Sequence, residues 1–141
     1  GGLLADRITA VPGSSNYFLA SLVTYSNKAK TRFLGVPARL IREKGAVSRE
    51  VAESMAAGAR KKTGANLALA TTGIAGPGGG STRKPVGLVY IGLASPDGIT
   101  VTENYFQGSR NQIKFQTTQK ALDMLRLKLK KYQDRDKVGS Q

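Results

Sequence analysis

The spacing of apolar residues along the chain predicts a series of helices. One segment carries a single apolar stripe at helical spacing, formed by Val51, Ala52, Met55, Ala56 and Ala59. Ser48 precedes this stripe as a typical N-cap, and Gly64 follows it as a typical C-terminal stop. The same criteria predict further helices over residues 1–10, 27–35, 37–44 and 110–132.

Short apolar runs bounded by turn residues predict strands between these helices. The runs cover residues 22–26, 66–72, 86–94 and 99–106. Within 66–72 the residues from Leu67 to Ala70 are continuously apolar, which is typical of a buried strand. Pro96-Asp97-Gly98 separates the last two runs and predicts a hairpin.

The stretch from Thr71 to Gly80 follows the buried strand directly and is a candidate binding loop. It contains five glycines, one proline and two threonines, so its main-chain amides can approach a ligand closely. A Walker loop would need lysine and a hydroxyl residue at Gly79 and Gly80, and a dinucleotide site would need a helix where the run at 86–94 follows. The loop therefore predicts a strand-loop-strand site for an anionic or strongly polar ligand. A hairpin connection without a ligand is the alternative.

The composition narrows the chemistry that the chain can perform. Its 141 residues include no cysteine and no histidine, which excludes a thiol nucleophile, a Ser-His-Asp triad and any Cys- or His-ligated metal centre. The length suits one domain, and no run approaches the roughly 20 apolar residues of a membrane span. Ser, Thr, Tyr, Lys, Arg and nine carboxylates are left to carry any reaction.

The chain is strongly basic, with 22 Lys and Arg against 9 Asp and Glu and a formal net charge of +13. Such a surplus attracts anions, either a phosphorylated metabolite or nucleic acid. Nine basic and three acidic residues lie between Arg110 and Lys137, where a solvated helix face is the commoner explanation. No RNP, helix-turn-helix or zinc-finger pattern is present. We therefore do not expect nucleic-acid binding, and keep it as an alternative class of function.

Several short segments together resemble one family. They are Val11 to Phe18, Val23 to Asn27 with Lys30, Leu34-Gly35-Val36, Gly45-Ala46-Val47-Ser48, Thr72 to Pro77, and Lys84-Pro85-Val86-Gly87. Their order and spacing are similar to those of the CinA carboxy-terminal domain, a family that comprises bacterial nicotinamide mononucleotide deamidases. The resemblance extends from Gly1 to about Leu129.

The resemblance implies a fold and an activity. The fold is an α/β three-layer sandwich of a mixed sheet with helices on both faces, expected over residues 1–133 and followed by a polar tail at 134–141. The activity is a cytoplasmic amidohydrolase, without metal or cofactor, that converts nicotinamide mononucleotide to nicotinic acid mononucleotide and ammonia in pyridine nucleotide recycling. The expected partner is the small-molecule mononucleotide and not a membrane. A homodimer is an expectation if the apolar surface of the last helix is larger than one hydrophobic core can cover.

The resemblance also assigns the site. The nucleophile falls on Ser15, with Ser14 as the fallback, the base on Lys30, and an active-site tyrosine on Tyr25. The residues expected to bind substrate are Ser14, Thr72, Gly73, Ala75, Gly76 and Arg110. Family members also carry Ala-Glu-Ser-Cys-Thr, with an upstream strand and helix, before the Gly-Gly pair that opens this sequence, and that serine belongs to the family's site. We therefore expect the N-terminal strand and helix of the fold to be missing.

A Ser/Lys pair can hydrolyse an amide only if the lysine is neutral. Its pKa must fall from about 10.4 toward roughly 7 or 8, and burial lowers it, as do cations such as Lys28 or Arg110 if they lie nearby. An exposed helix lysine is the plain alternative for Lys30, and a half-buried strand aromatic is the alternative for Tyr25. Because the family domain often follows a separate pyrophosphatase-like domain, a non-catalytic nucleotide-binding or regulatory module is the alternative function.

Overall fold

Three strands form one antiparallel sheet in the computed structural model, which describes residues 1–138. They are β1 (Ala68–Gly73), β2 (Leu88–Ser95) and β3 (Gly98–Tyr105), in the spatial order β1-β2-β3. Ala68 lies opposite Ala94 between β1 and β2, and Ser95 lies opposite Gly98 at the tight turn between β2 and β3. The predicted hairpin is confirmed.

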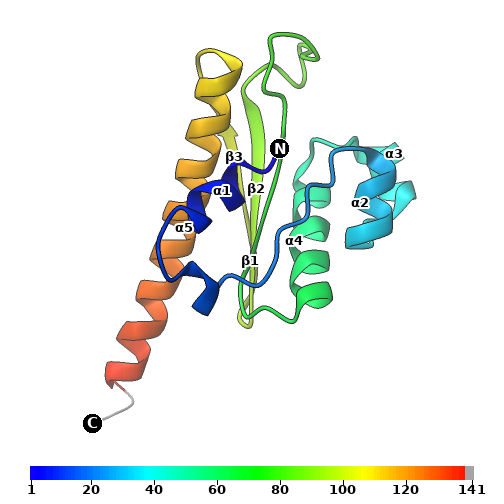
Figure 1. Ribbon diagram of the computed structural model, residues 1–141. Coiled ribbons are helices and arrows are strands. Elements are labelled where there is room, and N and C mark those ends of the chain that lie inside the picture. The colour runs from blue at the N-terminus through cyan, green and yellow to red at the C-terminus, as the bar shows by residue number, and fades with distance from the viewer. Residues whose placement is uncertain (139–141) are drawn as a thin grey trace.

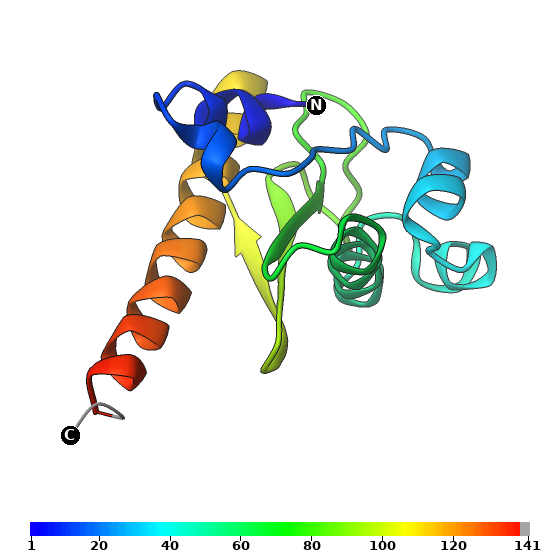
Figure 2. The same ribbon diagram turned by 60° about the horizontal axis from the view of Figure 1, so that its bottom comes forward.

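Helices cover both faces of this sheet (Figures 1 and 2). One face carries α4 (Arg49–Thr63), with α2 (Asn27–Leu34) and α3 (Ala38–Lys44) packed outside it. The other face carries α5 (Arg110–Val138) and α1 (Leu3–Thr9), and the short 3-10 helix η1 (Ser14–Asn16) lies beside α1. The α/β fold with helices on both faces of the sheet is confirmed.

The helix α4 forms where the apolar stripe predicts it. The Ser48 hydroxyl accepts a hydrogen bond from the amide of Val51 at 3.3 Å, and Gly64 ends the helix with a φ of 72°. Its buried face packs on the sheet and on the segment after α2, in a core that contains Leu34, Val36, Ile41, Val51, Met55, Ala56, Ala70 and Ala94. Gly92 lets α4 approach the sheet closely, since an added Cβ there would lie 2.7 Å from the Ala52 carbonyl oxygen.

Alternate residues of β2 point to opposite faces, so the strand is apolar on both sides. Val89 and Ile91 join Ile113 and Ala121 of α5 in a second core. Leu4 of α1 packs against the edge of this core. The two cores sandwich the central strand.

The structure differs from the predictions in three places. Both strand pairings are antiparallel, whereas we expected a mixed sheet. Residues 22–26 do not pair as a strand, and the Thr24 carbonyl accepts a hydrogen bond from the Lys30 side chain. The last helix continues to Val138, past the boundary expected at residue 133, and residues 139–141 of the predicted tail lie outside the described residues.

An acidic residue on the hairpin turn pairs with two cations in the C-terminal half of α5. Asp97 accepts hydrogen bonds from Lys128 Nζ at 2.8 Å and from Arg135 Nη1 at 3.1 Å. The two cations lie seven positions apart, about two helical turns, so both face the same turn. In the described residues, no helix has the length and apolar character needed to cross a membrane.

Candidate active site

The most unusual side chain of the predicted site is Lys30, because it is buried. It lies on α2, is 7% exposed, and donates from Nζ to the Thr24 carbonyl oxygen at 2.8 Å. Within residues 1–138 no carboxylate forms an ion pair with it. Burial lowers the pKa of Lys30 below its ordinary value of 10.5. Burial is the cause of this shift. We expected Lys28 and Arg110 to lower the pKa of Lys30 further, but neither is among its causes.

A second group of predicted residues meets at the start of α5. Arg110 donates from Nη2 to the Tyr25 hydroxyl at 2.9 Å and from Nη1 to the Gly76 carbonyl oxygen at 2.8 Å. Tyr25 itself is 72% exposed. One guanidinium therefore connects the segment before α2, the glycine-rich loop and α5.

Three cationic side chains lie near Gly1, the first residue of the sequence. Burial and the cations Lys114, Arg110 and Lys30, in that order, lower the pKa of the Gly1 α-amino group. An added Cβ at Gly1 would lie 3.8 Å from Lys114 Nζ. Lys30, Arg110 and Lys114 therefore lie around Gly1, and these three side chains are called the cationic cluster, with Lys30 as its buried member. Lys114 was not among the predicted residues, although its position four residues after Arg110 places both on one face of a helix.

The glycine-rich loop connects β1 to β2 and is closed at its base. The Ile74 amide donates to the Leu88 carbonyl at 2.9 Å, and the Gly87 amide donates to the Ile74 carbonyl at 2.8 Å. Gly73 is the exposed last residue of β1, while Ala75 packs against the core under α5. The loop therefore leaves the sheet at the predicted position.

Gly76 sits at the sharpest part of this loop. Its φ is 79°, a left-handed conformation that favours glycine. An added Cβ would lie 2.5 Å from Val86 Cγ1. The peptide bond from Gly76 to Pro77 is cis.

Thr72 is buried, and its hydroxyl is bonded to main chain. Its hydroxyl donates to the Ala46 carbonyl oxygen at 2.7 Å, in the turn between α3 and α4. This contact gives Thr72 a structural role. It ties the end of β1 to the helix layer on that face.

The structure does not bring the two predicted serines to Lys30. Ser14 is buried at the start of η1, and its carbonyl accepts from the amides of Tyr17 and Phe18. Ser15 is exposed on the same short helix. In both ribbon views η1 lies beside α1 on the α5 side of the sheet, whereas α2 lies beyond α4 (Figures 1 and 2). No hydrogen bond joins either serine to Lys30 in the described chain.

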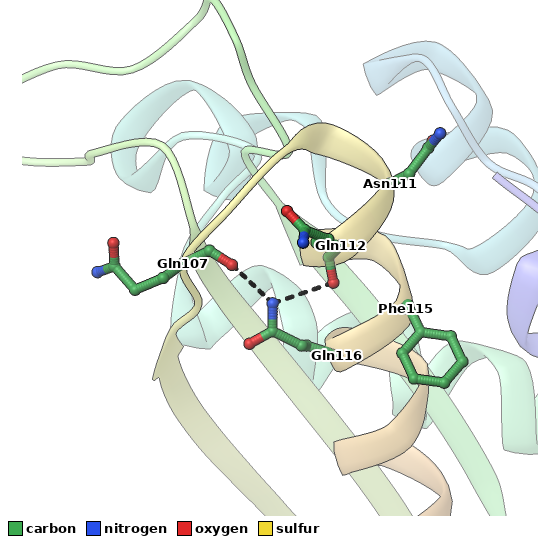
Figure 3. Close-up of a pocket in the computed structure, with 5 residues that line it drawn as sticks. All are labelled: Gln107, Asn111, Gln112, Phe115 and Gln116. Atoms are coloured by element: carbon green, nitrogen blue, oxygen red, sulfur yellow. Dashed lines mark hydrogen bonds between the residues drawn. The ribbon is translucent and has the colours of Figure 1, made fainter.

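Two surface cavities lie elsewhere. The cavity in Figure 3, of about 450 Å³, is lined by Gln107, Asn111, Gln112, Phe115 and Gln116 on the outer side of α5. Its Gln116 amide donates to the carbonyl oxygens of Gln107 and Gln112. The other, of about 540 Å³, lies along the second half of α5. Neither cavity includes Lys30, Tyr25 or Arg110.

The donors of the site suit an anion better than a metal ion. No group of three or more Asp, Glu, His or Cys side chains lies close enough within residues 1–138 to hold a metal. The cationic cluster and the main-chain amides of the loop both favour negative charge. An uncharged lysine at position 30 would add a base to this surrounding.

Most of this chain is similar in sequence to known proteins. Residues 1–129 match the family model described as the CinA C-terminal domain. CinA-like proteins of Geotalea uraniireducens and Geobacter sulfurreducens are each 57% identical over 129 residues, which is 92% of this chain and 31% of theirs. The chain therefore spans about a third of the length of these curated relatives.

Solved structures with related folds agree with this match. The crystal structure of the competence/damage inducible protein CihA from Agrobacterium tumefaciens is 45% identical, with a TM-score of 0.86 over 89% of this chain and 77% of that chain. The competence damage-inducible protein A (ComA) from Klebsiella pneumoniae is 29% identical, with a TM-score of 0.88 over 92% of this chain and 80% of that chain. The chain belongs to the CinA C-terminal domain family.

Proposed function

We propose that this chain is an amidohydrolase domain that converts nicotinamide mononucleotide to nicotinic acid mononucleotide and ammonia. The observation that carries the proposal is Lys30, a buried amine with a lowered pKa and no carboxylate partner in the described chain. Burial shifts this amine toward its neutral form, and in that form it can take a proton from a hydroxyl. A lysine on a helix surface would lack this shift.

The surroundings of Lys30 suit a phosphorylated substrate. Arg110 and Lys114 supply fixed positive charge, and Arg110 can hold two phosphate oxygens with its planar fork. None of the hydrogen bonds of the described residues uses the amides of Gly76 and residues 78–80, so these amides are available to a phosphate or to an oxyanion. Tyr25 already accepts a hydrogen bond from Arg110 and is accessible to a ligand.

The proposed reaction has two halves. A serine hydroxyl gives its proton to neutral Lys30 Nζ while its oxygen bonds to the carboxamide carbon, and loop amides stabilise the resulting oxyanion. Protonated Lys30 then returns the proton to the leaving nitrogen, the C–N bond breaks and ammonia departs. Water, deprotonated by the same amine, hydrolyses the acyl-serine ester and releases the acid.

Two serines are candidates for the nucleophile. Ser15 is the predicted one, and its position on η1 requires a rearrangement before it could meet Lys30. The second is the serine in the Ala-Glu-Ser-Cys-Thr segment of family members. An added Cβ at Gly1 would lie 3.8 Å from Lys114 Nζ, so residues joined to Gly1 would lie near the cationic cluster. This position keeps the second serine as a candidate.

An assay of ammonia release separates the two. The chain as given is compared with the same chain carrying Ala-Glu-Ser-Cys-Thr before Gly1, and Ser15→Ala and Ser14→Ala are made in both. If Ser15 attacks, the unextended chain is active and Ser15→Ala abolishes turnover. If the added serine attacks, only the extended chain is active, and its activity survives Ser15→Ala.

The alternative function predicts a different result from the same proteins. A non-catalytic nucleotide-binding module would bind nicotinamide mononucleotide in a calorimetric titration and release no ammonia from either chain. That pair of results would contradict the proposed function. A basic nucleic-acid-binding domain would instead shift duplex DNA in a gel at physiological salt, with a steep dependence on salt.

A further inference from the structure

Lys84 lies in the glycine-rich loop and does not extend into solvent. Its Nζ donates to the carbonyl oxygen of Lys44 at 2.6 Å and to that of Val47 at 2.7 Å. The acceptors lie at the end of α3 and in the turn that joins α3 to α4, about 40 positions earlier in the chain. An ammonium has three donors and no acceptor, so two of its three donors are used to hold main chain together.

The acceptors explain why a cation is favoured there. Lys44 is the last residue of α3, and its carbonyl is one of the groups that a helix leaves without an internal partner. Positive charge at a helix C-terminus is also favourable. A neutral side chain of the same length would satisfy neither carbonyl.

Lys84 is one of two outer attachments of the loop, on opposite sides. Arg110 holds the Gly76 carbonyl from the α5 side of the sheet, and Lys84 holds the α3–α4 turn on the α4 side. Between them, the Ser81 amide donates to the Lys84 carbonyl at 2.8 Å, and the Lys84 amide donates to the Ser81 hydroxyl at 3.1 Å. The position of the Lys84 side chain is thereby coupled to the course of the loop main chain.

The α3–α4 turn is itself a fixed point. Thr72, at the end of β1, holds the Ala46 carbonyl of this turn, and the Ser48 hydroxyl donates to the Gly45 carbonyl at 2.9 Å. Lys84 therefore attaches the loop to a segment that the sheet and α4 already hold. A loop fixed at its base and on both sides needs little ordering when a ligand binds its amides.

We propose that Lys84 is a positioning residue that fixes the glycine-rich loop in its ligand-binding conformation without touching the substrate. The kinetic consequence rests on the proposed function, whereas the consequence for loop order does not. Removal of the Lys84 amine frees the loop on the α4 side and leaves Arg110 as its one side-chain attachment among the described contacts.

The test compares Lys84→Met with Lys84→Arg and with Lys61→Met, a matched loss of an exposed lysine on α4. Hydrogen exchange of the substrate-free proteins is followed in residues 74–87 and 44–48. In Lys84→Met we expect these amides to exchange roughly tenfold faster or more, while β2 keeps its protection. Lys84→Arg restores most of the protection, and Lys61→Met changes nothing.

Deamidation of nicotinamide mononucleotide supplies the second measurement. We expect Lys84→Met to raise KM about tenfold while kcat stays within about threefold, because the bound loop is ordered again by the substrate. Unchanged exchange in the loop of Lys84→Met overturns the proposal, and so does faster exchange with unchanged KM. If Lys84→Met does not fold, Lys84→Gln is measured in its place with the same expectations.

The two proposals fail in different ways. A wild-type protein that releases no ammonia contradicts the proposed function and leaves the exchange measurement to decide on Lys84 alone. In that case KM is replaced by the dissociation constant of nicotinamide mononucleotide from calorimetry. Equal affinity in wild type and Lys84→Met would then overturn the positioning role.

Discussion

Arg110 Nη2 lies 2.9 Å from the hydroxyl oxygen of Tyr25, a residue 85 positions earlier in the chain. The same guanidinium also holds the Gly76 carbonyl. Three separate parts of the chain thus depend on one exposed side chain. Since a guanidinium has five donors, the contacts with Tyr25 and Gly76 orient the fork without using it up.

We expect Arg110→Ala to raise KM for the mononucleotide far more than it lowers kcat. A hydrogen bond to a charged group contributes about 1.5–3 kcal/mol, so the expected rise in KM is roughly 10- to 100-fold. Arg126→Ala is the matched control, because Arg126 lies on the same helix and pairs with Asp123 at the surface. A fall in kcat with KM unchanged would instead move Arg110 into the chemical step.

Lys30→Met should remove the proposed base. General-base catalysis contributes roughly 10²- to 10⁴-fold, and we expect kcat/KM for deamidation to fall by that amount while mononucleotide binding persists. Lys28→Met, an exposed lysine on the same helix, serves as the control. Equal turnover by wild type and Lys30→Met would exclude Lys30 as the base.

The lowered pKa of Lys30 also predicts a pH-dependent stability. Between the folded pKa and the ordinary value of 10.5, the unfolded chain binds more protons than the folded chain, so this group raises the free energy of unfolding as pH increases. The cost of burying the charge is complete below the folded pKa. Denaturant titrations of wild type and Lys30→Met should therefore show the wild type gaining stability on the variant as pH rises toward 10.5. A constant difference across this range would contradict the lowered pKa.

Two glycines of the loop offer a matched pair of substitutions. In Gly76→Ala the new Cβ meets Val86 at 2.5 Å and the residue keeps a φ of 79°, whereas at Gly78 no atom lies within 4 Å. The left-handed conformation alone costs about 1–2 kcal/mol for alanine. We expect Gly76→Ala to lower the free energy of unfolding by at least that much and to weaken mononucleotide binding, with Gly78→Ala close to wild type. Melting temperatures and calorimetry measure the two effects, and equal behaviour of the two variants would show that the loop adapts.

Another glycine controls how close α2 comes to α4. An added Cβ at Gly58 would collide with the Leu34 carbonyl oxygen at the end of α2. Overpacking of this kind costs typically 1–3 kcal/mol, and it would displace the helix that carries Lys30. We expect Gly58→Ala to lose stability in denaturant titrations and also to lose activity. Ala57→Ser, an exposed neighbour on α4, is the control and should change neither.

Sequence alone predicted the parts of the fold that local rules determine. Local signals predicted α4, namely the N-cap Ser48, the C-terminal Gly64 and the apolar stripe between them. The turn at Asp97 predicted the hairpin. Residues 22–26 alternate as a strand does, yet pairing depends on a neighbour that local sequence does not specify. The structure uses the Thr24 carbonyl for Lys30 instead.

The candidate site was predicted only in part, because it too depends on contacts between distant parts of the chain. Tyr25, Gly76 and Arg110 meet as expected, although 85 positions separate the first from the last. Burial of Lys30 was expected only through the role that the resemblance gives it, and the contacts of Lys84 were not predicted, since both arise from tertiary packing and lysine is usually exposed. The expected meeting of Ser15 with Lys30 rested on the family resemblance, whereas residues 17–26 lead from the α5 side to the α4 side of the sheet.

The single carboxylate of Asp97 connects the hairpin turn to the second half of α5. Because Lys128 lowers the pKa of Asp97 chiefly through a hydrogen bond, its support of α5 persists at mildly acid pH and is lost as pH falls through the lowered value. Salt screens the same exposed pairs. Acid or concentrated salt should therefore loosen the C-terminal half of α5 from the hairpin, while the core contacts of Ile113 and Ala121 keep its first half on the sheet.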